Sequence, residues 1–164
     1  MIGVSVYIAS TKEQQDKTIS MLKADDYCFI SLHHPLDLID SFKENAFNLI
    51  DRINASKANI IADIAPAGIE KLGFPSFREM AKSNIVWGLR PDYGLSAKEI
   101  VAASDYTNIV INASCIDEEL VDLLEQSGNK YYAMHNFYPR PETGLDIDYC
   151  NECTKYLHAH GAKV

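Results

Sequence analysis

The residues best suited to chemistry lie together near the end of the chain. They read HNFYPRPETGL over positions 135–145. His135 can donate or accept a proton near neutral pH, and Asn136 offers a donor and an acceptor in fixed geometry. Arg140 carries a planar fork of donors that suits a carboxylate or a phosphate, and Tyr138 offers a ring that can stack on a sugar. This segment predicts binding of a polar, anionic substrate.

Alternating apolar and helical segments must position these groups. Six apolar, strand-like segments begin near residues 3, 27, 58, 84, 107 and 130, at intervals of 23 to 31 residues. Ser10 with Glu13, and Ser96 with Glu99, form capping boxes that predict helix starts. Helices are also expected over 35–55, 67–72, 76–82, 114–127 and 146–160, and a seventh strand is expected to begin at 162. Repeated strand–helix units require parallel strands joined by crossovers.

The fold class expected from this pattern is α/β, with a parallel (β/α)8 TIM-barrel arrangement. An open doubly wound sheet is the alternative, but the turn after the first strand lacks a glycine-rich phosphate loop. Polar residues end nearly every strand, as they do on the catalytic rim of a barrel. These strand-end residues are Tyr7, His33, Asp63, Arg90, Asn112 and His135.

The length predicts an incomplete barrel. A barrel takes about 250 residues, whereas this chain has 164. We therefore expect one truncated barrel domain over 1–164, with about six strand–helix units. Its open edges predict self-association, either as a homo-oligomer or as a swapped dimer.

The composition is that of a folded domain, with 47% hydrophobic and 23% charged residues. The net charge of −8 argues against nucleic acid and membrane partners, because both bind through clustered Lys and Arg. No apolar run reaches the roughly 18–20 residues of a spanning helix, and the first residues lack a basic signal region. A cytoplasmic location is expected. Cys28 and Cys115 are predicted to be buried. The lone pair Cys150-x-x-Cys153 is a weak signal for zinc, and it falls inside an expected helix.

The segment HNFYPRPETGL resembles a signature of the bacterial 6-phospho-N-acetylmuramidases, a family formerly called outer surface proteins. The segments GVSVY at 3–7, ADI at 62–64, RPDYG at 90–94 and INAS at 111–114 are similar to blocks of that family, in the same order. The resemblance implies a TIM barrel followed by a cyclophilin-like domain, which is expected to be absent here. It also implies hydrolysis of the β-1,4 bond between N-acetylmuramic acid 6-phosphate and N-acetylglucosamine, in cell-wall sugar recycling.

Glycoside hydrolysis uses one carboxyl group as proton donor and another as nucleophile or base. We predict Asp63 and Asp92 as this pair, with Glu142 in reserve. Asp63 follows an apolar run, so desolvation is expected to favour its protonated form, whereas Asp92 lies near Arg90, which favours the charged form. The alternative roles are a helix cap for Asp63 and a turn residue for Asp92.

Other candidates would bind the phosphorylated amino-sugar disaccharide. Arg90 and Arg140 suit its lactyl carboxylate or its phosphate. Partners for sugar hydroxyl and acetamido groups are Tyr7, His33, Asn112, His135 and Asn136, with Tyr138 and Glu142 beside them. No metal or cofactor is expected, because the adjacent His33 and His34 point to opposite faces of a strand. Trp87 is expected to pack in the core.

Two other functions stay open. One is a different barrel enzyme that acts on a phosphorylated sugar, such as an aldolase or epimerase. A Schiff-base aldolase needs a lysine at a strand end, whereas Lys57 and Lys130 precede strands. The other is a non-catalytic module that binds a phosphosugar or serves in assembly.

Overall fold

A single parallel sheet of six strands organises the chain in the order β1-β2-β3-β4-β5-β6. The computed structural model describes residues 3–32, 41–113, 116–134 and 147–163. The strands are β1 (Gly3–Tyr7), β2 (Tyr27–Ser31), β3 (Asn59–Ile64), β4 (Gly88–Pro91), β5 (Asn108–Asn112) and β6 (Tyr131–Met134). Sequential neighbours in one parallel sheet are the arrangement of a TIM barrel, so the expected fold class is confirmed.

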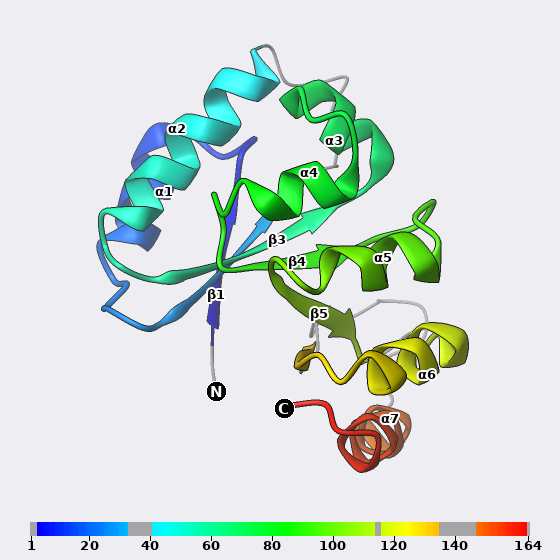
Figure 1. The fold of residues 1–164 in the computed structure, drawn as a ribbon. Helices are drawn as coiled ribbons and strands as arrows, with labels where there is room; N and C mark the ends of the chain where they lie inside the picture. Colours follow the sequence, from blue (N-terminus) through cyan, green and yellow to red (C-terminus); the bar gives the residue numbers. More distant parts are fainter. Residues whose placement is uncertain (1–2, 33–40, 114–115, 135–146, 164) are drawn as a thin grey trace.

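The helices lie along the outer side of this curved sheet (Figure 1). They are α1 (Lys12–Ile19), α2 (Phe42–Asn54), α3 (Pro66–Leu72), α4 (Phe77–Lys82), α5 (Ala97–Ala103), α6 (Glu118–Ser127) and α7 (Ile147–Ala159). Within the described residues β1 pairs with β2 alone, so the sheet is open. An isolated parallel bridge joins Tyr132 to Lys163, at the position where the sequence predicts a seventh strand. No helix of the described residues is long and apolar enough to cross a membrane.

The two faces of the sheet carry separate apolar layers. The larger layer packs the outer face against the helices and includes Leu49, Ile60 and Leu89. The inner face carries a smaller layer that contains Phe29, Ile61 and Val110. Both faces of the central strands are therefore covered, which explains their continuous apolar sequences.

Trp87 packs in the inner layer, as expected, but it precedes β4 rather than lying within it. Its ring meets the ring of Tyr27 edge-on at 5.0 Å and that of Tyr132 at 4.9 Å. Strand β4 begins at Gly88, four residues later than the start near 84 that the sequence predicts. Asn84 has a φ of 52°, and this left-handed conformation interrupts an extended chain.

The predicted capping box is present at the start of α5, whereas a different pair of residues caps α1. Ser96 and Glu99 form the expected capping box of α5. The expected box of Ser10 with Glu13 is wrong, since Thr11 and Gln14 form the capping box of α1. The N–H of Ser10 instead donates to the carbonyl of Tyr7 at 3.1 Å, so Ser10 belongs to the turn that follows β1.

The other helices agree in place and differ at their ends. Helix α2 begins at Phe42, and residues 33–40, where an earlier start was expected, lie outside the described residues. Asp117 caps α6. Ser114, where the sequence predicts this helix to begin, lies outside the described residues. The short helices α3 and α4 occupy the predicted positions.

Candidate functional site

One row of side chains crosses four strands at the carboxyl end of the sheet. Tyr7 is in register with Ser31, Ser31 with Asp63, and Asp63 with Arg90. Phe29 lies two residues before Ser31 and belongs to the inner layer. Because strand residues two apart share a face, this row continues the inner layer toward the carboxyl edge. Three of the predicted site residues therefore share one row.

Asp63 and Arg90 form a buried ion pair at the centre of this row. The Nε of Arg90 donates to Oδ1 of Asp63 at 2.9 Å, and the side chains are 7% exposed for Asp63 and 9% for Arg90. The guanidinium carbon of Arg90 lies 5.4 Å from the centre of the Phe29 ring. The ring covers one side of the guanidinium, so its polar contacts are directed along its plane.

This pairing differs from the environment that the sequence predicts for Asp63. Desolvation was expected to favour the protonated acid, with Arg90 near Asp92 instead. Arg90 belongs to β4 and stands beside Asp63 in register. The carboxylate of Asp63 therefore accepts a hydrogen bond from a buried guanidinium, which is a partner that the sequence assigned to Asp92.

One terminal nitrogen of the Arg90 guanidinium lacks a hydrogen-bond partner among the described residues. This atom, Nη1, is buried. Buried donors are nearly always paired, and an arginine has five N–H donors to satisfy. The inner row therefore contains an unused cationic donor.

Asp92 and Asn112 stand at the same carboxyl edge. The N–H of Asp92 donates to the carbonyl of Ile64 at 2.9 Å, which extends the contact between β3 and β4 beyond the strand end. Oδ1 of Asp92 accepts a hydrogen bond from the N–H of Tyr93 at 2.9 Å. Asp92 is half-buried and Asn112, the last residue of β5, is likewise half-buried. Both are accessible to a ligand at this edge.

Six other predicted site residues lie outside the described residues. They are His33, His135, Asn136, Tyr138, Arg140 and Glu142. Their assignment to the site remains a prediction.

A polar clamp behind β1 was missed by the sequence reasoning. The Nε2 of Gln15 donates to the carbonyls of Tyr7, Ile8 and Ser10 at 3.0, 3.1 and 3.2 Å. Its Oε1 accepts from Nη1 of Arg52 at 2.7 Å. This clamp fixes the turn after Tyr7, and the mixed polar sequence of α1 contains no periodic signal that would reveal it.

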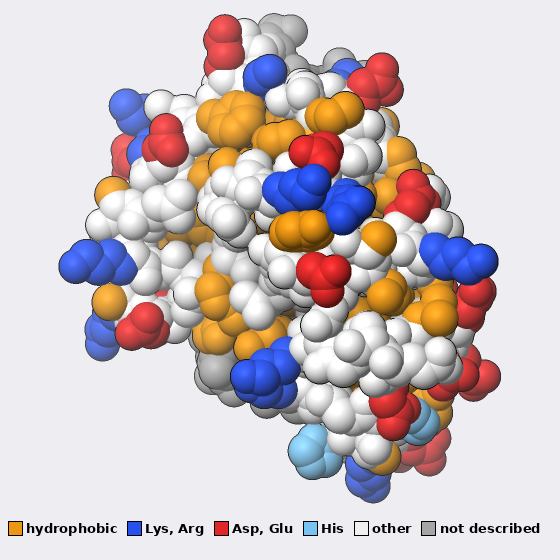
Figure 2. All heavy atoms as spheres, in the orientation of Figure 1, with side chains coloured by type: hydrophobic (Ala, Val, Ile, Leu, Met, Phe, Trp, Pro, Cys, Tyr) orange, Lys and Arg blue, Asp and Glu red, His pale blue; other side chains and the backbone are white. Residues whose placement is uncertain are grey.

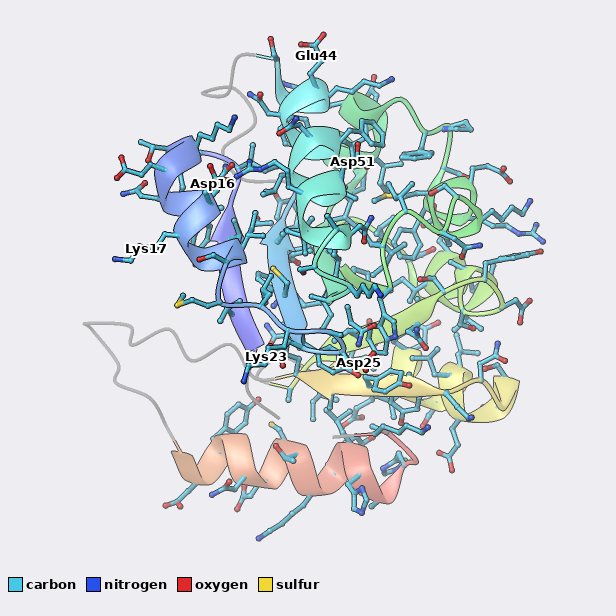
Figure 3. The ribbon with its side chains drawn as sticks, turned by 90° about the vertical axis from the view of Figure 1, so that its left-hand side faces the viewer. Asp16, Lys17, Lys23, Asp25, Glu44 and Asp51 are labelled. Carbon is cyan, nitrogen blue, oxygen red and sulfur yellow. The ribbon has the colours of Figure 1, made fainter. Side chains whose placement is uncertain are left out.

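The same arginine ties α1 to α2. Arg52 also contacts the carboxylate of Asp16, and Figure 3 shows α1 and α2 side by side, with Lys17 pointing away from them. Ser31 was missed as well, although its position two residues after a buried aromatic residue was a signal that could have found it.

A concave region lies at the opposite, amino-terminal edge of the sheet. It has a volume of about 560 Å³ and is lined by Trp87, Asp105 and Asn129, among others. There the Nδ2 of Asn129 donates to Oγ of Ser104 and to Oδ1 of Asp105, both at 2.8 Å. These polar groups satisfy one another, unlike the Arg90 donor at the carboxyl edge.

Both cysteines whose side chains the structure describes are buried in the core. Cys28 is fully buried, as expected, and burial raises the pKa of its thiol to about 12. Cys153 is buried in α7, the helix that contains the Cys150-x-x-Cys153 pair. Across the described ranges, no group of three His, Cys, Asp or Glu residues is arranged to hold a metal ion. Cys115 lies outside those ranges.

Comparison with known proteins identifies the family of the chain. The family model described as "6-phospho-N-acetylmuramidase, N-terminal" matches residues 2–164. The chain belongs to this family. The family that the HNFYPRPETGL segment resembles is therefore the family that the family model identifies over residues 2–164.

Solved structures support the fold of this muramidase-family chain. A conserved Enterococcus faecalis protein of unknown function is 30% identical, with a TM-score of 0.79 over 99% of this chain and 46% of that one. An uncharacterised Bacillus cereus protein is 24% identical, with a TM-score of 0.67 over 98% of this chain and 45% of that one. The chain therefore spans less than half the length of either protein.

A more distant similarity concerns the fold alone. A Coccidioides immitis protein assigned as a fructose-1,6-biphosphate aldolase is 14% identical, with a TM-score of 0.50 over 97% of this chain and 68% of that one. No curated protein matches the chain.

Proposed function

We propose that this chain forms the N-terminal barrel part of a glycoside hydrolase. Its substrate would be the disaccharide of N-acetylmuramic acid 6-phosphate and N-acetylglucosamine, and the β-1,4 bond would be cleaved during cell-wall sugar recycling in the cytoplasm. Family membership supports this proposal. The observation that carries it is the buried pair of Asp63 and Arg90 at the carboxyl edge, where barrel enzymes hold their catalytic groups.

The two carboxylates take different parts in this reaction. The guanidinium of Arg90 holds the carboxylate of Asp63 in place at the carboxyl edge, so Asp63 serves as nucleophile or as general base. Asp92 serves as the acid that protonates the leaving oxygen, since it is half-buried just beyond β4 at the same edge. Glu142 is the reserve for that step. Tyr7 and Asn112 contact the sugar from the neighbouring strands.

The two roles are separable with leaving groups of different acidity. A nitrophenol leaves without protonation, whereas a sugar hydroxyl requires a general acid. Replacing the nucleophile or base impairs both substrates, because both need attack at the anomeric carbon. Asp63→Asn is therefore expected to lower kcat by about 100-fold or more on the nitrophenyl glycoside and on the disaccharide. Asp92→Asn is expected to lower kcat/KM on the disaccharide and to leave kcat/KM on the nitrophenyl glycoside nearly unchanged.

The assay compares two forms of the protein. One is the 164-residue chain, and the other is the same chain extended with the C-terminal portion of the Enterococcus faecalis relative, of which this chain spans 46%. Release of nitrophenol from a β-glycoside of N-acetylmuramic acid 6-phosphate by either form supports the proposal. If neither form turns over either substrate, the glycosidase proposal fails. Binding without turnover would then favour a phosphosugar-binding module.

A further inference from the structure

The environment of Arg90 restricts what it can bind. Its Nε is used by Asp63, and the Phe29 ring covers one side of the guanidinium. The Nη1 atom is buried without a hydrogen-bond partner among the residues that are described. An acceptor for the Nη1 donor must therefore approach in the plane of the guanidinium. This direction of approach suits a planar oxyanion.

The charge of the site selects a monoanion. Asp63 and Arg90 together carry no net charge, and Arg90 is the only buried cation of the described residues. A phosphate group carries a charge of about −1.5 to −2 at pH 7, which one buried guanidinium already paired with Asp63 compensates poorly. A carboxylate adds a single negative charge. It also offers planar oxygens in the geometry that arginine binds.

We infer that the Nη1 of Arg90 binds the carboxylate of an acidic sugar substituent and does not bind the phosphate. This inference rests on the proposed function, in which that substituent is the lactyl group of the muramic acid ring. Asp63 and the carboxylate then accept from the same guanidinium, through Nε and Nη1. The arginine thereby sets the distance between the substituent and the charged carboxylate of Asp63, and it selects substrates that carry the substituent.

A binding measurement tests the inference without turnover. The arginine side-chain ¹⁵N signals of the wild-type chain are recorded during titration with N-acetylmuramic acid 6-phosphate, and separately with N-acetylglucosamine 6-phosphate. These two sugars differ by the lactyl group alone. The signal that disappears in Arg90→Lys belongs to Arg90. A shift of this signal with the lactyl sugar alone is expected. Equal shifts with both sugars, or a shift with neither, overturn the inference.

A kinetic measurement tests the consequence for specificity. The wild type is expected to prefer the nitrophenyl glycoside with the lactyl group by about 10- to 100-fold in kcat/KM, as is typical for a hydrogen bond to a charged group. Arg90→Lys keeps a positive charge beside Asp63 but lacks the fork, so this preference falls to a few-fold. Arg78→Met, at an exposed position of α4, keeps the wild-type preference. An unchanged preference in Arg90→Lys refutes the inference.

The two proposals fail in distinguishable ways. If neither glycoside is hydrolysed but the Arg90 signal responds to the lactyl sugar alone, the glycosidase proposal fails and the carboxylate site stands. If both glycosides are hydrolysed equally well and Arg90 responds to both sugars, the hydrolase proposal stands and the carboxylate site fails.

Discussion

The ion pair of Asp63 with Arg90 predicts a large loss of stability when its charge balance is broken. Asp63→Asn is nearly isosteric, and its amide oxygen can still accept from Nε. It removes the negative charge, however, and leaves a guanidinium that is 9% exposed without a counter-charge. Breaking a buried pair in this way costs about 3–5 kcal/mol.

An exposed ion pair elsewhere in the chain provides the matched control. Arg52 contacts Asp16, and these side chains are 21% and 56% exposed. Surface pairs contribute about 0–1 kcal/mol, so Asp16→Asn is expected to change the free energy of unfolding by at most that amount. Urea unfolding of the wild type, Asp63→Asn and Asp16→Asn measures the difference directly. For a chain of this size, Asp63→Asn corresponds to a drop in Tm of roughly 6–20 °C.

A double variant tests whether the charge is the cause. In Asp63→Leu with Arg90→Met no buried charge remains, and apolar replacement of a buried pair is often neutral or stabilising. The double variant is therefore expected to be more stable than Asp63→Asn. If Asp63→Asn costs no more than Asp16→Asn, the pair is not buried in solution, and the reasoning about Asp63 and Arg90 is refuted.

Three further predictions concern the strands and turns around this site. Burial raises the pKa of Cys28 from 9.0 to about 12, so the folded state retains the thiol proton longer than the unfolded state. The contribution of the Cys28 thiol to the free energy of unfolding is constant below pH 9 and falls by about 1.4 kcal/mol per pH unit between pH 9 and about 12. Urea unfolding of Cys28→Ala should lack this part of the pH dependence. Gly68→Ala places a Cβ 2.3 Å from the carbonyl oxygen of Leu32, and this overlap with the backbone should cost about 3 kcal/mol or more. At Gly128 nothing lies within 4 Å, and the φ of 71° limits the cost of Ala to about 1–2 kcal/mol. A loss at Gly68 no larger than that at Gly128, measured by urea unfolding, would contradict the close approach. Gln15→Leu removes the donor to three carbonyls and should cost about 1–3 kcal/mol, with faster amide hydrogen exchange in the turn after β1, and unchanged exchange there would show that the clamp is dispensable.

Most of the secondary structure was predictable because its signals are local. Short apolar runs marked all six strands, and the capping box of Ser96 with Glu99 marked the start of α5. The same kind of signal failed where two choices lay side by side. Ser10 and Thr11 both suit a helix cap, and the turn bond from the N–H of Ser10 to Tyr7 decides between them. Asn84 has a left-handed conformation, which asparagine adopts more readily than most residues but which its presence in the sequence does not require.

The candidate site was predictable in its location and only partly in its contacts. Parallel strands bring their carboxyl ends to one edge, so Tyr7, Asp63 and Arg90 were expected near one another. Their shared row depends on inter-strand register, which the sequence does not state. Gln15 was missed because a clamp to backbone carbonyls leaves no periodic pattern in the sequence. Ser31 was detectable only through its position two residues after Phe29 on the same strand.

The sequence by itself determined the strand–helix alternation, the barrel class and the family, because these depend on periodicity and on short motifs along the chain. Only the tertiary structure decided which carboxylate Arg90 contacts. Along the chain Arg90 is two residues from Asp92 and 27 residues from Asp63. Alignment of β4 beside β3 nevertheless places Arg90 level with Asp63. The physical reason is that a parallel sheet aligns residues by hydrogen-bond register, and burial in the inner layer then requires the two opposite charges to pair.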